Sequence, residues 1–175
     1  FHSDMTQAIG KIPVSFHDVD MASISAHKIF GPKGIGLFYK NSRVKLMPII
    51  HGSGKSNDLK PGTPAVPLIV AFSKALRLAL MDLDKRENFV RRLNEKIVTE
   101  ISKMDGILIN QTKYSIPQIL NISLLKVRPE TFIHAMEEYE VYLGTNTACA
   151  SGELSTSIMA IYNDKKRALG TIRIS

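Results

Sequence analysis

The chain has 175 residues, 44 % of them hydrophobic, and a formal net charge of +7. This length allows one or two domains with packed cores, and no apolar run is long enough to cross a bilayer. The basic residues are scattered and form no nucleic-acid-binding motif, so we expect neither nucleic acid nor membrane as a partner. The single cysteine cannot form an internal disulfide, which is consistent with the reducing cytoplasm.

The first 50 residues alternate short β-prone segments with polar turns. Sequence patterning predicts two strands, residues 19–24 and 35–39, joined by a polar connection that contains glycine. Weaker strand-like segments are expected at residues 8–14, 16–20 and 44–50. Scaffolds commonly display functional groups on connections between strands, so the polar side chains of residues 25–34 are candidates for a site.

Two helices of different character follow. Residues 66–81 are apolar at most positions, which predicts a largely buried helix. The second helix has apolar residues on one face at steps of three and four: Phe89, Leu93, Ile97, Ile101 and Met104. The change of character predicts a domain boundary near Asp84, with domains at residues 1–84 and 85–175.

The remaining sequence predicts a small α/β domain. Strands are expected at residues 107–109, 119–124, 141–143 and 171–174, and helices at residues 129–139 and 153–161. Residues 144–152 are expected to form a polar loop. This loop and the helix that follows it connect the last two strands.

The stretch between the first two strands reads Ser25-Ala26-His27-Lys28-Ile29-Phe30-Gly31-Pro32-Lys33-Gly34-Ile35-Gly36. An amine held in such a connection can form a Schiff base with a carbonyl compound. Taken alone, Lys28 has the simpler interpretation of a solvated surface lysine, because most lysines are exposed.

This stretch closely resembles the cofactor-lysine segment of the cysteine desulfurases, the NifS/IscS-like branch of the class-V aminotransferases. The resemblance implies the α/β fold of PLP-dependent (pyridoxal 5′-phosphate-dependent) transferases of fold type I. Residues 1–84 then form the C-terminal half of the PLP-binding large domain, and residues 85–175 form the small C-terminal domain. Lys28 is implied to bind the cofactor, and Ser25 and His27 to bind its phosphate with a hydroxyl and an imidazole.

Asp4 and Gln7, in Ser3-Asp4-Met5-Thr6-Gln7, resemble the family residues that contact the cofactor ring. A carboxylate keeps the pyridine nitrogen protonated, and an amide can donate to the ring oxygen without adding charge. The alternative is that Asp4 is a turn residue and Gln7 a helix-surface residue.

Two further residues resemble family binding residues. Thr63 follows Lys60-Pro61-Gly62 and is similar to the threonine that reaches the phosphate of the neighbouring subunit, which implies a homodimer; Lys60-Pro61 replaces the family's Arg-Ser. Arg173 resembles the arginine that grips the substrate carboxylate, a group that a guanidinium fork fits with two parallel hydrogen bonds. The alternative for Arg173 is a surface ion pair.

Cys149 lies in Gly144-Thr145-Asn146-Thr147-Ala148-Cys149-Ala150-Ser151, 121 positions after Lys28. The segment resembles the long cysteine loop of the desulfurases and implies catalytic roles for Lys28 and Cys149. The thiolate would take the sulfur of L-cysteine as a persulfide, release L-alanine and deliver the sulfur to an acceptor or scaffold protein, for iron–sulfur cluster assembly or thiolation. No metal site is expected.

The family is about twice as long as this chain, which begins just before the aspartate and stops just after the arginine of the resemblance. We therefore expect a fragment of a larger enzyme that is inactive in isolation. The alternatives left open are a selenocysteine lyase or an aminotransferase on the same fold, or a catalytically inactive fragment that binds a partner.

Overall fold

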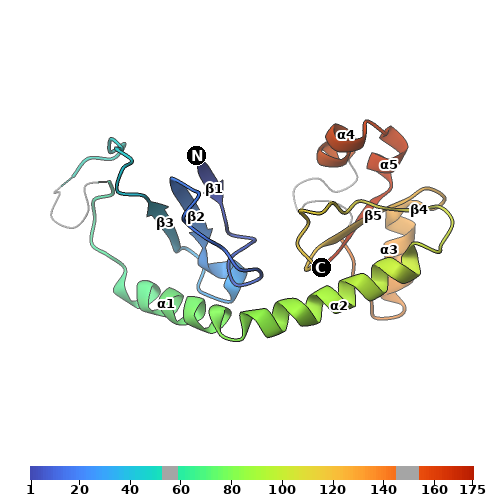
Figure 1. Ribbon diagram of the computed structural model, residues 1–175, viewed down its shortest axis with the longest axis horizontal. Helices are drawn as coiled ribbons and strands as arrows, with labels where there is room; N and C mark the ends of the chain where they lie inside the picture. Colours follow the sequence, from blue (N-terminus) through green and yellow to red (C-terminus); the bar gives the residue numbers. More distant parts are fainter. Residues whose placement is uncertain (53–58, 145–153) are drawn as a thin grey trace. The chain divides into compact units, whose positions relative to one another are not determined.

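The computed structural model describes residues 1–52, 59–144 and 154–175. The chain divides into two compact units, Phe1–Arg86 and Glu87–Ser175, close to the boundary expected near Asp84. Each unit contains its own three-stranded sheet, so the expected mixed α/β architecture is confirmed (Figure 1). Of the helices described, none combines the length and the apolar character needed to cross a membrane.

The sheet of the first unit combines parallel and antiparallel pairing. Strand β1 (His2–Asp4) runs parallel to β2 (Met21–Ser25), and β2 runs antiparallel to β3 (Gly36–Lys40). Asp4 is the register partner of Ser23. A short 3₁₀ helix, η1 (Ala26–Ile29), follows β2 directly, so the chain turns sharply at the carboxyl end of that strand.

The core of the first unit lies between the sheet and α1 (Val66–Leu80). Its buried members are Met5, Ile9, Val19, Ala22, Ile24, Ala26, Ile29 and Phe72. Alternation along β2 explains its contribution, because Ala22 and Ile24 point to one face of the strand. Pro67 lies in the first turn of α1, where its missing N–H has no helical partner to lose.

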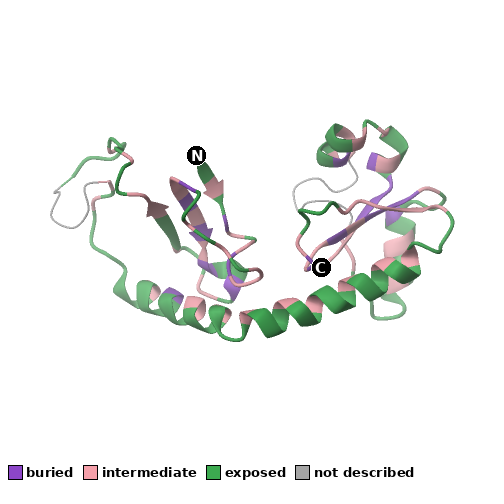
Figure 2. Ribbon diagram, in the orientation of Figure 1, coloured by how far each residue is buried: buried purple, intermediate pink, exposed green. Residues whose placement is uncertain are grey.

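The expectation that residues 66–81 form a largely buried helix is wrong. Only Phe72 of α1 is buried, whereas Val66 and Val70 are 59 % and 62 % exposed. Figure 2 shows most of α1 in the colour of exposed residues. The small sheet of this unit covers one stripe of the helix, and the other apolar side chains remain accessible to solvent.

The weaker strand-like segments do not form strands. Residues 8–14 form turns that include Gly10 at φ 73°, and residues 16–20 and 44–50 are turns or irregular. Proline explains part of this result, because Pro13 and Pro48 cannot donate to a strand ladder. Residues 141–143 also lie outside any strand, although the adjacent Gly144 forms an isolated bridge with Arg173.

The second unit has an antiparallel sheet in the order β4-β5-β6. The strands are β4 (Ile107–Ile109), β5 (Leu120–Leu124) and β6 (Thr171–Ile174). The helices are α2 (Leu83–Ile101), whose first turn belongs to the first unit, α3 (Pro129–Glu137), α4 (Thr156–Tyr162) and α5 (Lys165–Leu169). The expected strand at residues 171–174 is confirmed, and α5 was not expected.

The two faces of this sheet differ in chemistry. Leu120, Ile122, Leu124 and Ile172 form the buried core, with Val98 and Ile101 of α2 and Phe132 of α3 packed against it. Side chains alternate along a strand, so Asn121 and Arg173, which are register partners, lie on the opposite face. That face is polar and also includes Ser123 and Thr171, which are fully enclosed.

Gly170, just before β6, provides a test of how tightly this sheet is packed. A Cβ at this position would lie 2.2 Å from the carbonyl oxygen of Leu124, a backbone atom that cannot move aside. We expect Gly170→Ala to lower the free energy of unfolding by about 3 kcal/mol, the upper end of typical overpacking costs. Chemical denaturation measures this change. Gly144→Ala is the control, because its Cβ would meet only ordinary contacts of 3.8 Å and longer; equal stability of the two variants would contradict the packing.

Candidate functional site

Four of the predicted site residues meet at one edge of the first sheet. Asp4 ends β1, Ser25 ends β2, and His27 and Lys28 follow in η1. Because β1 and β2 are parallel neighbours, their carboxyl ends lie at the same edge. In α/β sheets this is the edge at which ligands bind. Gln7 lies in the turn that follows β1 and is exposed.

Thr6 links the two strand ends. Its backbone N–H donates to Asp4 Oδ1 at 2.9 Å, and its Oγ1 accepts from the backbone N–H of Ser25 at 3.1 Å. Hydrogen bonds from the Thr6 side chain and backbone lower the pKa of Asp4 below its ordinary value. Asp4 is therefore an ionised, pre-positioned acceptor. The sequence analysis did not single out Thr6, although an aspartate two residues before a threonine is a signal for a side-chain-stabilised turn.

Ser25 and His27 are joined directly. Ser25 Oγ lies 2.8 Å from His27 Nδ1. This contact orients the ring and leaves the second ring nitrogen, Nε2, available to a ligand. Hydroxyl and imidazole donors in this arrangement suit a phosphate group.

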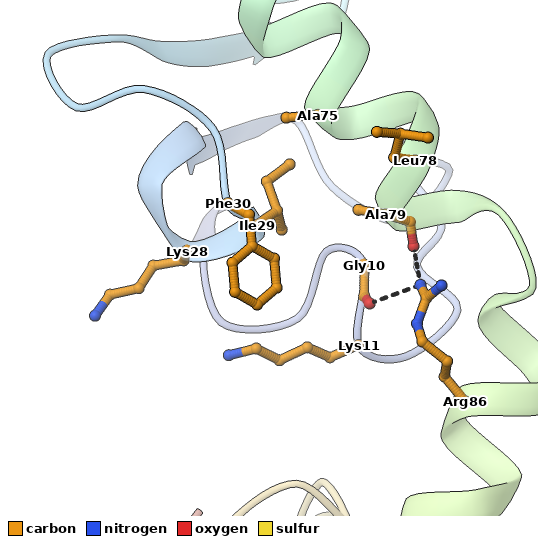
Figure 3. Close-up of a pocket in the computed structure, with 9 residues that line it drawn as sticks. All are labelled: Gly10, Lys11, Lys28, Ile29, Phe30, Ala75, Leu78, Ala79 and Arg86. Atoms are coloured by element: carbon orange, nitrogen blue, oxygen red, sulfur yellow. Dashed lines mark hydrogen bonds between the residues drawn. The ribbon is translucent and has the colours of Figure 1, made fainter.

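Lys28 is one of the residues that line a pocket of about 400 Å³ in the first unit, and its side chain extends away from the other lining residues (Figure 3). The pocket lies between η1, the Gly10 turn and the last turns of α1 (Figure 3). Among the residues that the structure describes, none forms a hydrogen bond or ion pair with the Lys28 amine. The amine is thus accessible for reaction with a carbonyl compound.

Lys11 is a second cation at this pocket, and the sequence analysis missed it. Burial, and then the charge of Lys28, lower the pKa of Lys11. Its Nζ donates to Gln7 Oε1. An ammonium group can only donate, so the amide of Gln7 must turn its oxygen to Lys11 and keep its NH₂ group for another acceptor.

Arg86 fixes the other side of the pocket. Its guanidinium donates to the carbonyl oxygens of Ala79 and Met81 at the end of α1, and lies 3.5 Å from the Gly10 carbonyl oxygen (Figure 3). The residue therefore caps α1 and stabilises its junction with the turn that follows β1. Since its donors are used in this way, we assign Arg86 a structural role.

This set of groups fits pyridoxal phosphate. An ionised carboxylate, Asp4, suits a pyridinium nitrogen, and the NH₂ of Gln7 suits a ring oxygen. Ser25 and His27 supply donors for the phosphate, and Lys28 supplies an accessible amine for the aldehyde. Within the described ranges no cluster of three or more His, Cys, Asp or Glu could hold a metal ion.

The other predicted site residues belong to other segments of the chain. Thr63 is exposed in the segment that leads to α1. Arg173 belongs to β6 of the second unit. Cys149 lies outside the described residues.

A lysine in the turn after β2, at the carboxyl edge of two parallel strands, is an arrangement that fits pyridoxal phosphate. The family description "Aminotransferase class-V" matches residues 1–175. The chain belongs to the class-V aminotransferase family, whose members depend on pyridoxal phosphate.

Within this family, the chain is similar to proteins named cysteine desulfurase. The chain is 36 % identical to the mitochondrial cysteine desulfurase of Arabidopsis thaliana, with 99 % of this chain and 40 % of that protein covered. It is 33 % identical to the cysteine desulfurase IscS of Dictyoglomus turgidum, covering 100 % of this chain and 46 % of that protein. The chain therefore spans less than half the length of these relatives.

Solved structures agree with this assignment. A NifS-like protein superposes with a TM-score of 0.82 at 34 % identity, covering 99 % of this chain and 46 % of the other. DndA from Streptomyces lividans superposes with a TM-score of 0.77 at 27 % identity, covering 98 % of this chain and 51 % of the other. The fold is that of PLP-dependent proteins of fold type I.

Replacing Thr6 tests the link between the strand ends. Thr6→Val removes the hydroxyl that supports the Asp4 carboxylate, so we expect the pKa of Asp4 to rise toward its ordinary value. In the unmodified chain, the stabilisation from the lowered pKa is present above the ordinary carboxyl pKa and is lost as the pH falls through the lowered value. In the variant this loss begins at higher pH. NMR titration of the side-chain carboxyl measures the shift.

Thr99→Val is the matched control, because the Thr99 hydroxyl bonds to a carbonyl within α2. This control should leave the titration of Asp4 unchanged. An unchanged Asp4 titration in Thr6→Val as well would contradict the proposed link.

Proposed function

We propose that this chain provides the cofactor lysine and the sulfur-transfer cysteine of a PLP-dependent cysteine desulfurase. The observation that supports this most directly is the convergence of Lys28 with Asp4, Ser25 and His27 at the carboxyl ends of parallel strands. The matched relatives named cysteine desulfurase, at 33–36 % identity over almost all of the chain, favour this activity within the family.

The residues of the first unit hold the cofactor. Asp4 accepts from the pyridinium nitrogen, and the NH₂ of Gln7, oriented by Lys11, donates to the ring oxygen. Ser25 and His27 bind the phosphate, and Thr63 contacts the phosphate bound by a second copy of the chain in a homodimer. When bound, the cofactor supplies an electron sink for the charge that develops at the α-carbon of the substrate.

Lys28 has two roles in this proposal. Its Nζ would hold the cofactor at the aldehyde carbon. As a neutral amine, the same Nζ would take a proton from the substrate α-carbon and later return a proton to the product. The absence of a competing partner among the described residues keeps Nζ available for both roles.

The second unit binds and cleaves the substrate, L-cysteine. Arg173 pairs with the carboxylate, and the Cys149 thiolate attacks the substrate sulfur. The new S–S bond forms as the C–S bond breaks, and the electrons of the C–S bond remain on the substrate carbon. Protonation of that carbon gives L-alanine, which is released. Cys149 then holds a persulfide for transfer to a cytoplasmic acceptor or scaffold protein in iron–sulfur cluster or thiolation pathways.

Cofactor trapping tests the role of Lys28. Because the chain spans less than half the length of its relatives, we expect weak retention, so pyridoxal phosphate is supplied in excess and the adduct is fixed with borohydride. Peptide mass mapping should place the adduct on Lys28, and Lys28→Ala should lose at least about 90 % of it. Lys33→Ala, an exposed lysine in the same connection, should retain the adduct. Labelling spread evenly over the lysines would contradict the assignment.

The sulfur-transfer step is tested in a chimaera that joins this chain to the rest of a matched desulfurase. Cys149→Ala should retain the cofactor absorbance and lose persulfide formation from L-cysteine, because the thiolate that takes the sulfur is gone. Alkylation followed by mass spectrometry detects the persulfide. Full sulfur transfer by Cys149→Ala would overturn the mechanism, and alanine release from selenocysteine but not from cysteine would instead indicate a selenocysteine lyase.

A further inference from the structure

A row of polar residues crosses the sheet of the second unit on the face opposite its core. Asn110, directly after β4, pairs its backbone N–H with the Asn121 carbonyl oxygen at 2.9 Å. Asn121 is the register partner of Arg173, and Arg173 pairs on its other side with Gly144. The order across the sheet is therefore Asn110, Asn121, Arg173 and Gly144.

Arg167 sets the direction of the hydrogen bonds along this row. Its Nε donates to Asn110 Oδ1 at 2.6 Å, and a guanidinium has no acceptor, so the Asn110 oxygen must face it. The Asn110 NH₂ then donates to Asn121 Oδ1 at 2.6 Å. The amide of Asn121 is thereby oriented with its NH₂ group as the remaining donor.

Arg167 is itself held in place, so this orientation has a fixed origin. Its guanidinium carbon lies 3.4 Å from the centroid of the Tyr162 ring, and its Nη2 donates to the Ile109 carbonyl oxygen at 2.8 Å. The backbone N–H of Arg167 donates to the Asp164 carboxylate at 3.0 Å. Stacking and the two side-chain hydrogen bonds, to Asn110 and Ile109, restrict the side chain, and the backbone bond to Asp164 fixes the start of α5.

Asn121 and Arg173 are the members of the row whose side-chain donors are available to a ligand. Directly opposite residues in antiparallel strands have Cβ atoms about 5 Å apart, within reach of one small ligand group. Gly144 lies beside the guanidinium, since a Cβ there would be in ordinary van der Waals contact with Arg173 Nη2, at 3.8 Å. In the part of the chain that the structure describes, neither the Asn121 NH₂ nor the Arg173 guanidinium has a recorded protein acceptor.

We propose that Asn121 is a second donor to the amino-acid carboxylate that Arg173 binds in the proposed function. The guanidinium supplies the charge and two parallel donors, and the Asn121 NH₂ supplies a neutral donor from the neighbouring strand. One positive charge matches one carboxylate. Asn121 therefore shares with Arg173 the recognition of the substrate in the proposed function, on which this inference rests for the identity of the amino acid.

Asn110 is a positioning residue in this site, because it acts only through Asn121. If the side chain at position 110 could only accept hydrogen bonds, the Asn121 amide would rotate to donate its NH₂ group to that side chain. Asn121 would then present its oxygen, rather than its NH₂ group, to the ligand. Asn110→Asp creates this situation while still accepting the hydrogen bond from Arg167.

NMR titration of the isotope-labelled 175-residue chain with L-alanine, without pyridoxal phosphate, tests the site. The Arg173 Nε–Hε and Asn121 NH₂ signals should shift together with one saturation curve. L-Alaninamide, in which a neutral amide replaces the carboxylate, should leave both signals unchanged. Asn121→Ala should weaken binding about tenfold, as expected for loss of a hydrogen bond to a charged group.

Two further variants distinguish recognition from folding. Asn110→Asp should also weaken binding, although it does not touch the ligand. Asn94→Ala is the control, because the Asn94 side chain bonds to the Pro117 carbonyl oxygen and to Gln111 in the same unit; it should bind L-alanine with unchanged affinity. Preserved dispersion of the backbone amide signals shows that each variant is folded.

The outcomes separate this inference from the proposed function. No shift in the unmodified chain, or unchanged affinity in folded Asn121→Ala, overturns the carboxylate site. Failure to trap the cofactor on Lys28, with L-alanine binding intact, overturns the desulfurase assignment and leaves the carboxylate site standing.

Discussion

The parallel pairing of β1 with β2 is the constraint on which the candidate site depends. It places the Asp4 carboxylate and the turn that holds Lys28 at one edge, although more than twenty residues separate them along the chain. Thr6 secures this edge with hydrogen bonds to both strand ends. Without that register, an acid, a hydroxyl–imidazole pair and an amine would be separate surface groups with no common ligand.

The exposed apolar residues of α1 and the greater length of the relatives both support the proposal that this chain functions within a larger assembly. The chain covers 40–46 % of two matched desulfurases, and apolar positions of α1 such as Val66 and Val70 are exposed among the residues that the structure describes. A solvated stripe of this kind is typical of a surface that packs against further polypeptide. The cofactor groups and the polar row of β4–β6 are therefore proposed to function within a larger assembly of the same fold.

The sequence predicted those features that depend on local chemistry. The final strand at residues 171–174 and the amphipathic second helix could be recognised from residue type and spacing. The segment around Lys28 was singled out by its resemblance to a family motif, because residue type alone favours a solvated lysine there. The burial of α1 could not be predicted, because apolar composition shows that a helix can be covered but not what covers it. Thr6 and Asn121 were missed for a related reason: their roles arise from hydrogen bonds between strands or turns whose register the sequence does not reveal. Lys11 was missed because its hydrogen bond to Gln7, four residues earlier, depends on how the turn after β1 folds.

A crystal structure of the chain with pyridoxal phosphate tests the central claim most directly. The density should run continuously from Lys28 Nζ to the cofactor, with Asp4 at the ring nitrogen and with Ser25 and His27 at the phosphate. A cofactor attached to another lysine, or one whose ring nitrogen faces away from Asp4, would contradict the claim that these groups form a single site.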